Sequence, residues 1–278
     1  MARRISFIAV EGQHDAAFVG ALLREAGFRI VTWKELNPKE PDSQFLDPAA
    51  RTLVPGGFPH ENNLLARVPV PFFWQKSDHV VALRPADGET KLISSILIAV
   101  RSIPPNQFSA IGVILDADKK KTPVQRLIAL RKALVDYIKQ AGVKNVGFSL
   151  PKKLDAYRIF RASKCGVFVM PDNLNAGTVE DLLLDCALIN YSNLQSEADK
   201  YLKAIDRSIL KSRDLDEITA PAGEKKALVG IIGSVLKPGK AIQVSISDNR
   251  WVNATTKAQP RVATLRTFLR DLLNEPTV

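Results

Sequence analysis

The chain has 278 residues, of which 46% are hydrophobic and 24% are charged, a composition typical of an ordinary globular protein. Its 39 basic and 29 acidic residues give a net charge of +10, and an excess of this size favours polyanionic partners, nucleic acid above all. No apolar run approaches the roughly 18 residues that cross a bilayer, so we expect no membrane partner.

The two cysteines show no metal-binding or disulfide pattern. Cys165 and Cys186 lie far apart and neither belongs to a CxxC pair, so we expect two reduced thiols in the core. The first apolar run, residues 5–10, is short for the hydrophobic region of a secretion signal and ends at Glu11 instead of a small-residue cleavage site. These features favour a cytoplasmic protein whose first apolar run is a strand.

Strand and helix patterns alternate from residue 5 to about residue 190. Apolar runs with the length of buried strands are followed by stretches with apolar residues at helical spacing. The expected strands are 4–10, a short one at 28–33, 79–85, 109–118 and 165–171, and the expected helices are 15–27, 89–102, 124–142 and 178–190. This alternation predicts an α/β fold in which a central parallel sheet lies between helices.

Two regions depart from the alternation. Residues 34–77 are rich in Pro, Asn and Gly and are too long for a simple connection, so we expect an irregular insertion there. Residues 191–278 look mainly helical, with a loop or small ribbon over residues 237–251. The sequence therefore predicts a core over residues 1–190 that contains the insertion, and a helical extension over residues 191–278 that packs on the core.

Three of the predicted strands end on acidic residues or run into them, and two more acids open the helix after the third: Glu11, then Asp116 and Asp118, then Asp172, then Glu180 and Asp181. In an open parallel sheet, ligands bind in the crevice beyond the carboxyl ends of the strands. Neighbouring strand ends would bring these carboxylates together although they are distant in sequence. An Asp at a strand end is also commonly a turn former or a helix cap, and this alternative stays open for Asp172 and Asp181.

A cluster of carboxylates is a candidate metal site. Carboxylates in one small volume raise one another's pKa values, and a divalent cation removes that repulsion. Oxygen ligands with room for water suit Mg²⁺ or Mn²⁺ better than zinc. Residues i and i+2 of an extended chain point the same way, so Asp116 and Asp118 can both face the metal. Asp15 follows Glu11 by four residues and either faces the same crevice or is favoured by the helix dipole.

Three segments resemble the Toprim domain: FIAVEGQHD (7–15), GVILDADKK (112–120) and GVFVMPDNLNAGTVEDLLL (166–184). They are most similar to the stand-alone Toprim-like proteins of uncharacterised function that are related to OLD-family nucleases. The resemblance covers about residues 5–190. It implies a compact, Rossmann-like fold with a central parallel sheet between helices.

The resemblance also implies roles for individual acids. Glu11 and the D-x-D pair Asp116 and Asp118 would be the catalytic residues and would together hold Mg²⁺ or Mn²⁺. The OLD-like branch adds a downstream acidic patch, which corresponds here to Glu180 with Asp181 beside it. With Asp15, the candidate metal ligands are therefore Glu11, Asp15, Asp116, Asp118, Glu180 and Asp181.

The chain lacks two features of the families that it resembles. It contains no G-x-x-x-x-G-K-[ST] motif, so an OLD-like role would need an ATPase on a separate chain, or none at all. The stretch ADGETKL (86–92) has only one Gly where a Gly-rich turn would follow a middle strand of a Toprim domain. A homodimer is a further arrangement that the sequence leaves open.

Basic residues beside the acids are candidates for nucleic-acid contact. Lys119, Lys120 and Lys121 directly follow the D-x-D pair, and Lys152 and Lys153 begin a second basic stretch. Lysines in such positions contact phosphates, and a merely solvated turn or face remains the alternative.

The acids and the basic composition favour divalent-metal-dependent phosphodiester chemistry on nucleic acid, DNA more than RNA. The first hypothesis is a nuclease in DNA repair or phage defence. The second is a non-catalytic Toprim-fold regulator that binds nucleic acid or nucleotide and acts with a partner protein. A third is a phosphatase or primase-like nucleotidyl transferase with the same metals. Phosphate chemistry follows from the acids, whereas the nuclease assignment rests on the family resemblance.

Overall fold

A central β-sheet organises the computed structural model, which describes residues 4–36, 48–54, 71–117, 121–142, 146, 148–160 and 162–276. Within these residues the sheet has seven strands in the order β2-β3-β4-β1-β5-β7-β6. The strands are β1 (Arg4–Val10), β2 (Arg29–Ile30), β3 (Phe72–Lys76), β4 (His79–Pro85), β5 (Phe108–Asp116), β6 (Tyr157–Phe160) and β7 (Ser163–Met170). The predicted α/β class is confirmed, with a sheet that is mostly parallel.

The four middle strands of the sheet are parallel. β1 pairs in parallel with β4 and with β5, and β5 pairs in parallel with β7. The outer strands β2, β3 and β6 are antiparallel to their neighbours. In this register Val10 lies beside Ile114, and Asp116 lies beside Met170. The chain therefore leaves β1, β5 and β7 at one edge, which we call the carboxyl edge.

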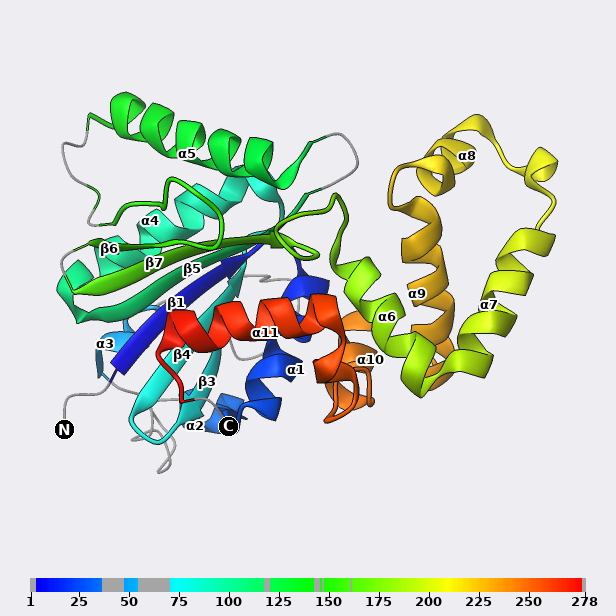
Figure 1. Cartoon of the computed structure of the whole chain (residues 1–278), viewed down its shortest axis with the longest axis horizontal. Coiled ribbons are helices and arrows are strands. Elements are labelled where there is room, and N and C mark those ends of the chain that lie inside the picture. The colour runs from blue at the N-terminus through cyan, green and yellow to red at the C-terminus, as the bar shows by residue number, and fades with distance from the viewer. Residues whose placement is uncertain are drawn as a thin grey trace.

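Helices cover both faces of the sheet (Figure 1). The described helices are α1 (Gln13–Glu25), α2 (Trp33–Leu36), α3 (Pro48–Arg51), α4 (Leu92–Ser102), α5 (Pro123–Gln140), α6 (Val179–Asn190), α7 (Ser192–Ala204), α8 (Ser212–Thr219), α9 (Gly223–Leu236), α10 (Ile242–Asp248) and α11 (Pro260–Leu273), with short 3₁₀ turns at Glu89–Lys91, Pro105–Gln107, Arg207–Ile209 and Thr256–Ala258. Alternate residues of β1 face opposite ways: Ile8 and Val10 join a core with α1, α6 and α11, whereas Phe7 and Ala9 join a core with α4 and α5.

The helix α11 packs closely on the sheet at two glycines. A Cβ added to Gly112 on β5 would lie 2.7 Å from Leu272, and one added to Gly166 on β7 would lie 2.9 Å from Phe268. Glycine at both positions therefore lets the helix approach the strands. The helix α11 is thus part of the main core.

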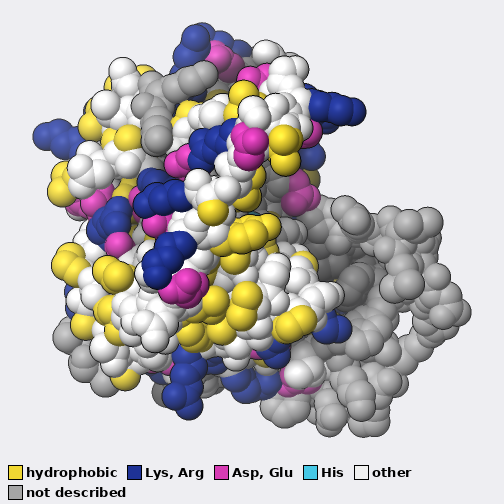
Figure 2. Space-filling view, turned by 90° about the vertical axis from the view of Figure 1, so that its right-hand side faces the viewer, with side chains coloured by type: hydrophobic (Ala, Val, Ile, Leu, Met, Phe, Trp, Pro, Cys, Tyr) yellow, Lys and Arg dark blue, Asp and Glu magenta, His cyan; other side chains and the backbone are white. Residues whose placement is uncertain are grey.

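The helices α7, α8 and α9 project from the right-hand side of Figure 1. Figure 2 looks onto that side and shows hydrophobic, basic and acidic side chains interspersed over the near face. Leu188, Tyr201 and Val235 are among the exposed hydrophobic side chains of α6, α7 and α9. The positive charge of the chain is therefore not gathered into a single patch on this face.

Two expectations for individual segments are wrong. Residues 72–76, assigned to the irregular insertion, form β3, whose Phe73 and Trp74 are buried in the sheet. Part of the segment 237–251, expected to be a loop or small ribbon, forms α10, which buries Ile246 against α1. Most of the remaining insertion, residues 37–47 and 55–70, lies outside the described residues.

The cysteines lie in the core, as expected. Cys165 and Cys186 are free and buried. Burial raises the pKa of both thiols, that of Cys186 to about 12, as expected for unreactive core cysteines. Across the described parts of the chain, we find no helix with the length and apolar character needed to cross a membrane.

Candidate functional site

Glu11 and Asp116 meet at the carboxyl edge of the sheet. Glu11 directly follows β1, and its Oε2 accepts a hydrogen bond from the backbone N–H of Asp116 over 3.3 Å. Asp116 is the last residue of β5, and its Oδ1 accepts from the N–H of Val179 at the start of α6 over 3.1 Å. The N-terminus of a helix favours an anion because its N–H groups and dipole point at it. The parallel order of β1 and β5 thus joins two acids that are distant in sequence.

The buried side chain of Arg126 contacts both residues, through the carboxylate of Glu11 and the backbone carbonyl of Asp116. Its side chain is 1% exposed and projects from the first turns of α5. Its Nε donates to the carbonyl oxygen of Asp116 over 2.6 Å, and one guanidinium nitrogen lies 3.2 Å from Oε2 of Glu11. The other pairs with Glu89, in the turn that follows β4. Arg126 therefore compensates part of the negative charge and fixes the orientation of Glu11.

Asp15 lies in the first turn of α1 and is 4% exposed. Its Oδ2 accepts a hydrogen bond from the backbone N–H of Gly12 over 2.6 Å. Burial raises the pKa of Asp15 to about 8, and the neighbouring charges of Glu11 and Glu180 add to this effect, while the Gly12 hydrogen bond and Lys226 oppose it. The mutual effect shows that Asp15, Glu11 and Glu180 share one electrostatic environment.

Glu180, in the first turn of α6, is 2% exposed. Its Oε1 lies 3.4 Å from Nδ1 of His14. Its Oε2 is buried and has no hydrogen-bond partner within the described residues. Burial raises the pKa of Glu180, but contacts with the side chains of His14 and Thr178, its own backbone N–H and the charge of Lys226 outweigh burial and hold the pKa below its usual value. A buried, ionised carboxylate oxygen without a partner is costly unless a ligand binds it.

Asp181 and Asp172 have other partners. Asp181 Oδ2 accepts from the backbone N–H of Thr178 over 3.0 Å, and its Oδ1 pairs with Lys225 and, at 3.6 Å, with Arg261. Asp172 accepts hydrogen bonds from the backbone N–H groups of residues 174 and 175, and these outweigh burial and lower its pKa. For both residues the structure favours the cap and turn alternative over metal ligation.

The other predicted site residues are exposed or lie outside the described residues. Asp118, Lys119 and Lys120 lie outside the described residues. Lys121 is exposed, with Nζ 3.9 Å from Glu89. Lys152 and Lys153 are exposed on the segment before β6. The structure thus brings together Glu11, Asp15, Asp116 and Glu180, which we call the acidic crevice. No group of three or more His, Cys, Asp or Glu side chains within the described residues already has the geometry to hold a metal.

Three residues around the acidic crevice were not predicted. Arg126, Lys225 and Lys226 come from α5 and α9. The burial of Arg126 could have been predicted from the sequence. Arg126 lies beside Leu127 and shares the helical face of Leu130 and Leu134, which are buried. The lysines of α9 carry no such signal, since only the folded chain brings α9 beside α6.

The fold and the crevice define an α/β protein with buried acids at the carboxyl edge of a mostly parallel sheet. A family model described as a protein of unknown function (DUF3226) matches residues 6–274, so the chain belongs to this family. The chain is similar to the solved crystal structure of hypothetical protein PH0156 from Pyrococcus horikoshii OT3, with 17% sequence identity, a TM-score of 0.48, and coverage of 98% of this chain and 96% of that one. Among curated proteins no match is found.

Proposed function

We propose that the acidic crevice supports divalent-metal-dependent phosphodiester chemistry on nucleic acid, and that the protein is a nuclease of the Toprim and OLD type. One observation carries the proposal. Glu11, Asp15, Asp116 and Glu180 gather where the strands end, and Glu180 Oε2 there is buried without a partner in the described structure. A cation is the ligand that such a set of acids favours.

The donor set fits a hard divalent cation. All of its side-chain donors are carboxylate oxygens, which Mg²⁺ and Mn²⁺ prefer. Glu11, Asp116 and Glu180 would hold the ion, and Asp15 would lose its proton to join them. Asp181 does not fit, because its oxygens already contact a backbone N–H and two cations. When bound, the ion would polarise a phosphate and lower the pKa of a bound water.

The residues around the acids have separate roles in this proposal. Arg126 holds Glu11 in a fixed orientation. His14, beside Glu180, is placed to move a proton to or from solvent because its side chain is 32% exposed. The net charge of +10 favours a polyanionic substrate, with DNA preferred over RNA as in the sequence-based hypothesis. A separate ATPase chain and a homodimer stay predictions.

The contact between Arg126 and Glu11 favours a second candidate. An arginine can neutralise a carboxylate in place of a metal, and the Toprim-like fold would then act as a non-catalytic regulator that binds nucleic acid or nucleotide with a partner protein. Metal binding separates the two candidates, because the regulator needs no ion at Glu11.

A paired assay of metal binding and cleavage tests the proposal. Mn²⁺ is titrated into the protein and followed by electron paramagnetic resonance, and cleavage of single-stranded DNA, plasmid DNA and RNA is measured with Mg²⁺ or Mn²⁺. We expect Asp116→Asn to lower cleavage about a hundredfold or more and to weaken Mn²⁺ binding. Asp199→Asn, which changes an exposed acid on α7, is the matched control and should change neither.

Each outcome of this assay decides between the candidates. Cleavage that depends on both the metal and Asp116 supports the nuclease. Mn²⁺ binding without cleavage of any substrate rejects the nuclease as a protein that acts alone. Absence of Mn²⁺ binding contradicts the metal site itself and favours the regulator.

A further inference from the structure

A cavity of about 370 Å³ lies at the edge of the sheet opposite the acidic crevice. The end of α1, the end of β3, the second half of α11 and the chain beyond α11 enclose it. Its volume is within the range of about 300–1,000 Å³ that is typical of small-molecule sites. It shares no lining residue with the acidic crevice.

The cavity combines an apolar floor with a basic rim. Leu22, Leu23, Phe28, Leu269 and Leu273 line it, and each is nearly fully buried. The rim carries four cations and two carboxylates, namely Lys76, Lys257, Arg266, Arg270, Glu25 and Glu275. The lining therefore has a formal excess of two positive charges over a hydrophobic base.

The cations differ in how far their charge is already compensated. Lys76 pairs with Glu275 at 2.9 Å, and Lys257 pairs with Glu25 at 3.4 Å. The Arg266 residue is exposed, and its guanidinium makes no hydrogen bond or ion pair with any other residue that the structure describes. A guanidinium group presents a planar set of donors that matches a carboxylate or a phosphate. Arg266 is thus the group available for the charged head of a ligand.

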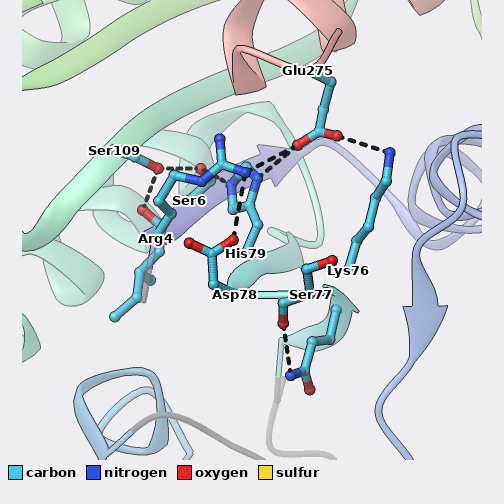
Figure 3. Close-up of polar contacts among 10 residues, drawn as sticks. Arg4, Ser6, Lys76, Ser77, Asp78, His79, Ser109 and Glu275 are labelled. Carbon is cyan, nitrogen blue, oxygen red and sulfur yellow. Dashed lines mark hydrogen bonds and ion pairs between the residues drawn. The ribbon is translucent and has the colours of Figure 1, made fainter. Parts of the chain in front are cut away.

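One wall of the cavity is held rigidly in place (Figure 3). Glu275 contacts Lys76, Arg4 at 3.6 Å, and Nδ1 of His79 at 3.1 Å. His79 is fully buried, and its Nε2 lies 2.9 Å from Oγ of Ser6 in β1. This network, which we call the Glu275 cluster, fixes the chain after α11 against the sheet. These contacts therefore hold one wall of the cavity in place.

We infer that this cavity binds an amphipathic organic anion, whose apolar body lies on the leucines of α1 and α11 and whose carboxylate or phosphate head contacts Arg266. The inference goes beyond the proposed function and does not depend on it, because the two sites use different residues at opposite edges of the sheet. A fatty-acid-like carboxylate and an alkyl phosphate share this chemistry, and the experiment distinguishes them.

Isothermal titration calorimetry of the full chain tests the inference with four probes. Octanoate and octyl phosphate carry both the apolar body and the charge, whereas octanol lacks the charge and inorganic phosphate lacks the body. We expect octanoate or octyl phosphate to bind at least about tenfold more tightly than octanol or inorganic phosphate. The tighter of the two identifies the head group.

Two variants locate the binding. Arg266→Gln removes the exposed guanidinium and should weaken binding of the anion about tenfold, whereas Arg213→Gln, which changes an exposed arginine on α8, should not. Ala26→Phe adds bulk at an exposed position in the lining without removing a core side chain, and should abolish binding.

Three results would overturn the inference. Equal affinity for octanol and octanoate would show an apolar cavity with no preference for anions. Equal affinity for inorganic and octyl phosphate would show a simple anion contact. Octanoate or octyl phosphate binding that Ala26→Phe leaves unchanged would show that it occurs elsewhere. Loss of metal binding in Asp116→Asn has no bearing on any of these, so the two proposals fail independently.

Discussion

Two buried carboxylates at opposite edges of the sheet, Glu275 and Asp15, have opposite pKa shifts. At the opposite edge, burial alone would raise the pKa of Glu275, but the contacts with Lys76 and His79 outweigh it and lower that pKa. At the carboxyl edge, burial raises the pKa of Asp15 to about 8 with two further acids nearby. A carboxylate paired with cations stabilises the fold in its ionised form. A buried carboxylate among like charges is stabilised by binding a proton or a cation, and such groups are common at functional sites.

Arg126 compensates the charge of Glu11 and Glu89 at the carboxyl edge, and of the changes that we consider its removal should give the largest effect. Arg126→Met keeps an apolar stem in place of the buried side chain but removes the guanidinium that pairs with Glu11 and Glu89. Because both acids are partly exposed, we expect a loss of about 2–3 kcal/mol in the free energy of unfolding, less than for a fully buried pair. Urea denaturation measures it.

Arg131→Met on the same helix is the control for this experiment. Arg131 is partly exposed, and a surface substitution of this kind should change the free energy of unfolding by no more than about 0.5 kcal/mol. A loss as small as this in Arg126→Met would show that Arg126 does not fasten the crevice.

The pattern of the sheet was predictable for a physical reason. A strand buried on both faces, such as β5, reads as a continuous apolar run, and such runs alternate with helical spacing along the chain. Short elements escaped this reasoning. β3 follows proline-rich sequence, and α10 has seven residues and follows Pro238 and Gly239. Both gain their burial from contacts with distant segments, which no local pattern contains.

The site was predictable to the extent that topology determines it. Parallel neighbours place Glu11 beside Asp116, and the sequence gives both the strands and the acids. The environment of each acid was not predictable. Asp181 looked like a ligand, but Lys225 and Arg261, from helices much later in the chain, pair with it. Whether a carboxylate is paired depends on tertiary contacts, so residue type and spacing alone cannot decide it.

The pH dependence of stability provides a second test of the contrast between Asp15 and Glu275. The pKa of Asp15 is raised to about 8 in the folded chain, so between about pH 4 and pH 8 the folded state holds a proton that the unfolded state has lost. This contribution to stability is therefore lost as the pH rises through that window. We expect Asp15→Asn to be more stable than the parent by about 1–2 kcal/mol at pH 8, as measured by denaturation.

Mg²⁺ provides the control for this effect. If the crevice binds the ion, Mg²⁺ should raise the stability of the parent at pH 8 more than that of Asp15→Asn, because it binds the folded state and compensates the charge. A parent and variant with the same pH dependence would contradict the raised pKa of Asp15.

The Glu275 cluster should show the opposite pH dependence with a smaller amplitude. Because the pKa of Glu275 is lowered, its contribution is present above the pKa of the unfolded chain and is lost as the pH falls through the folded value. Glu275→Gln keeps the shape and an acceptor oxygen but removes the charge that faces Lys76 and His79. We expect a loss of about 1 kcal/mol at pH 7 that disappears in acid. As a control, Glu197→Gln removes the exposed ion pair with Lys200 on α7 and should leave the free energy of unfolding unchanged at both pH values. A loss in Glu275→Gln that persists in acid would mean that the cluster acts through packing, and the contrast between the edges would then not be electrostatic.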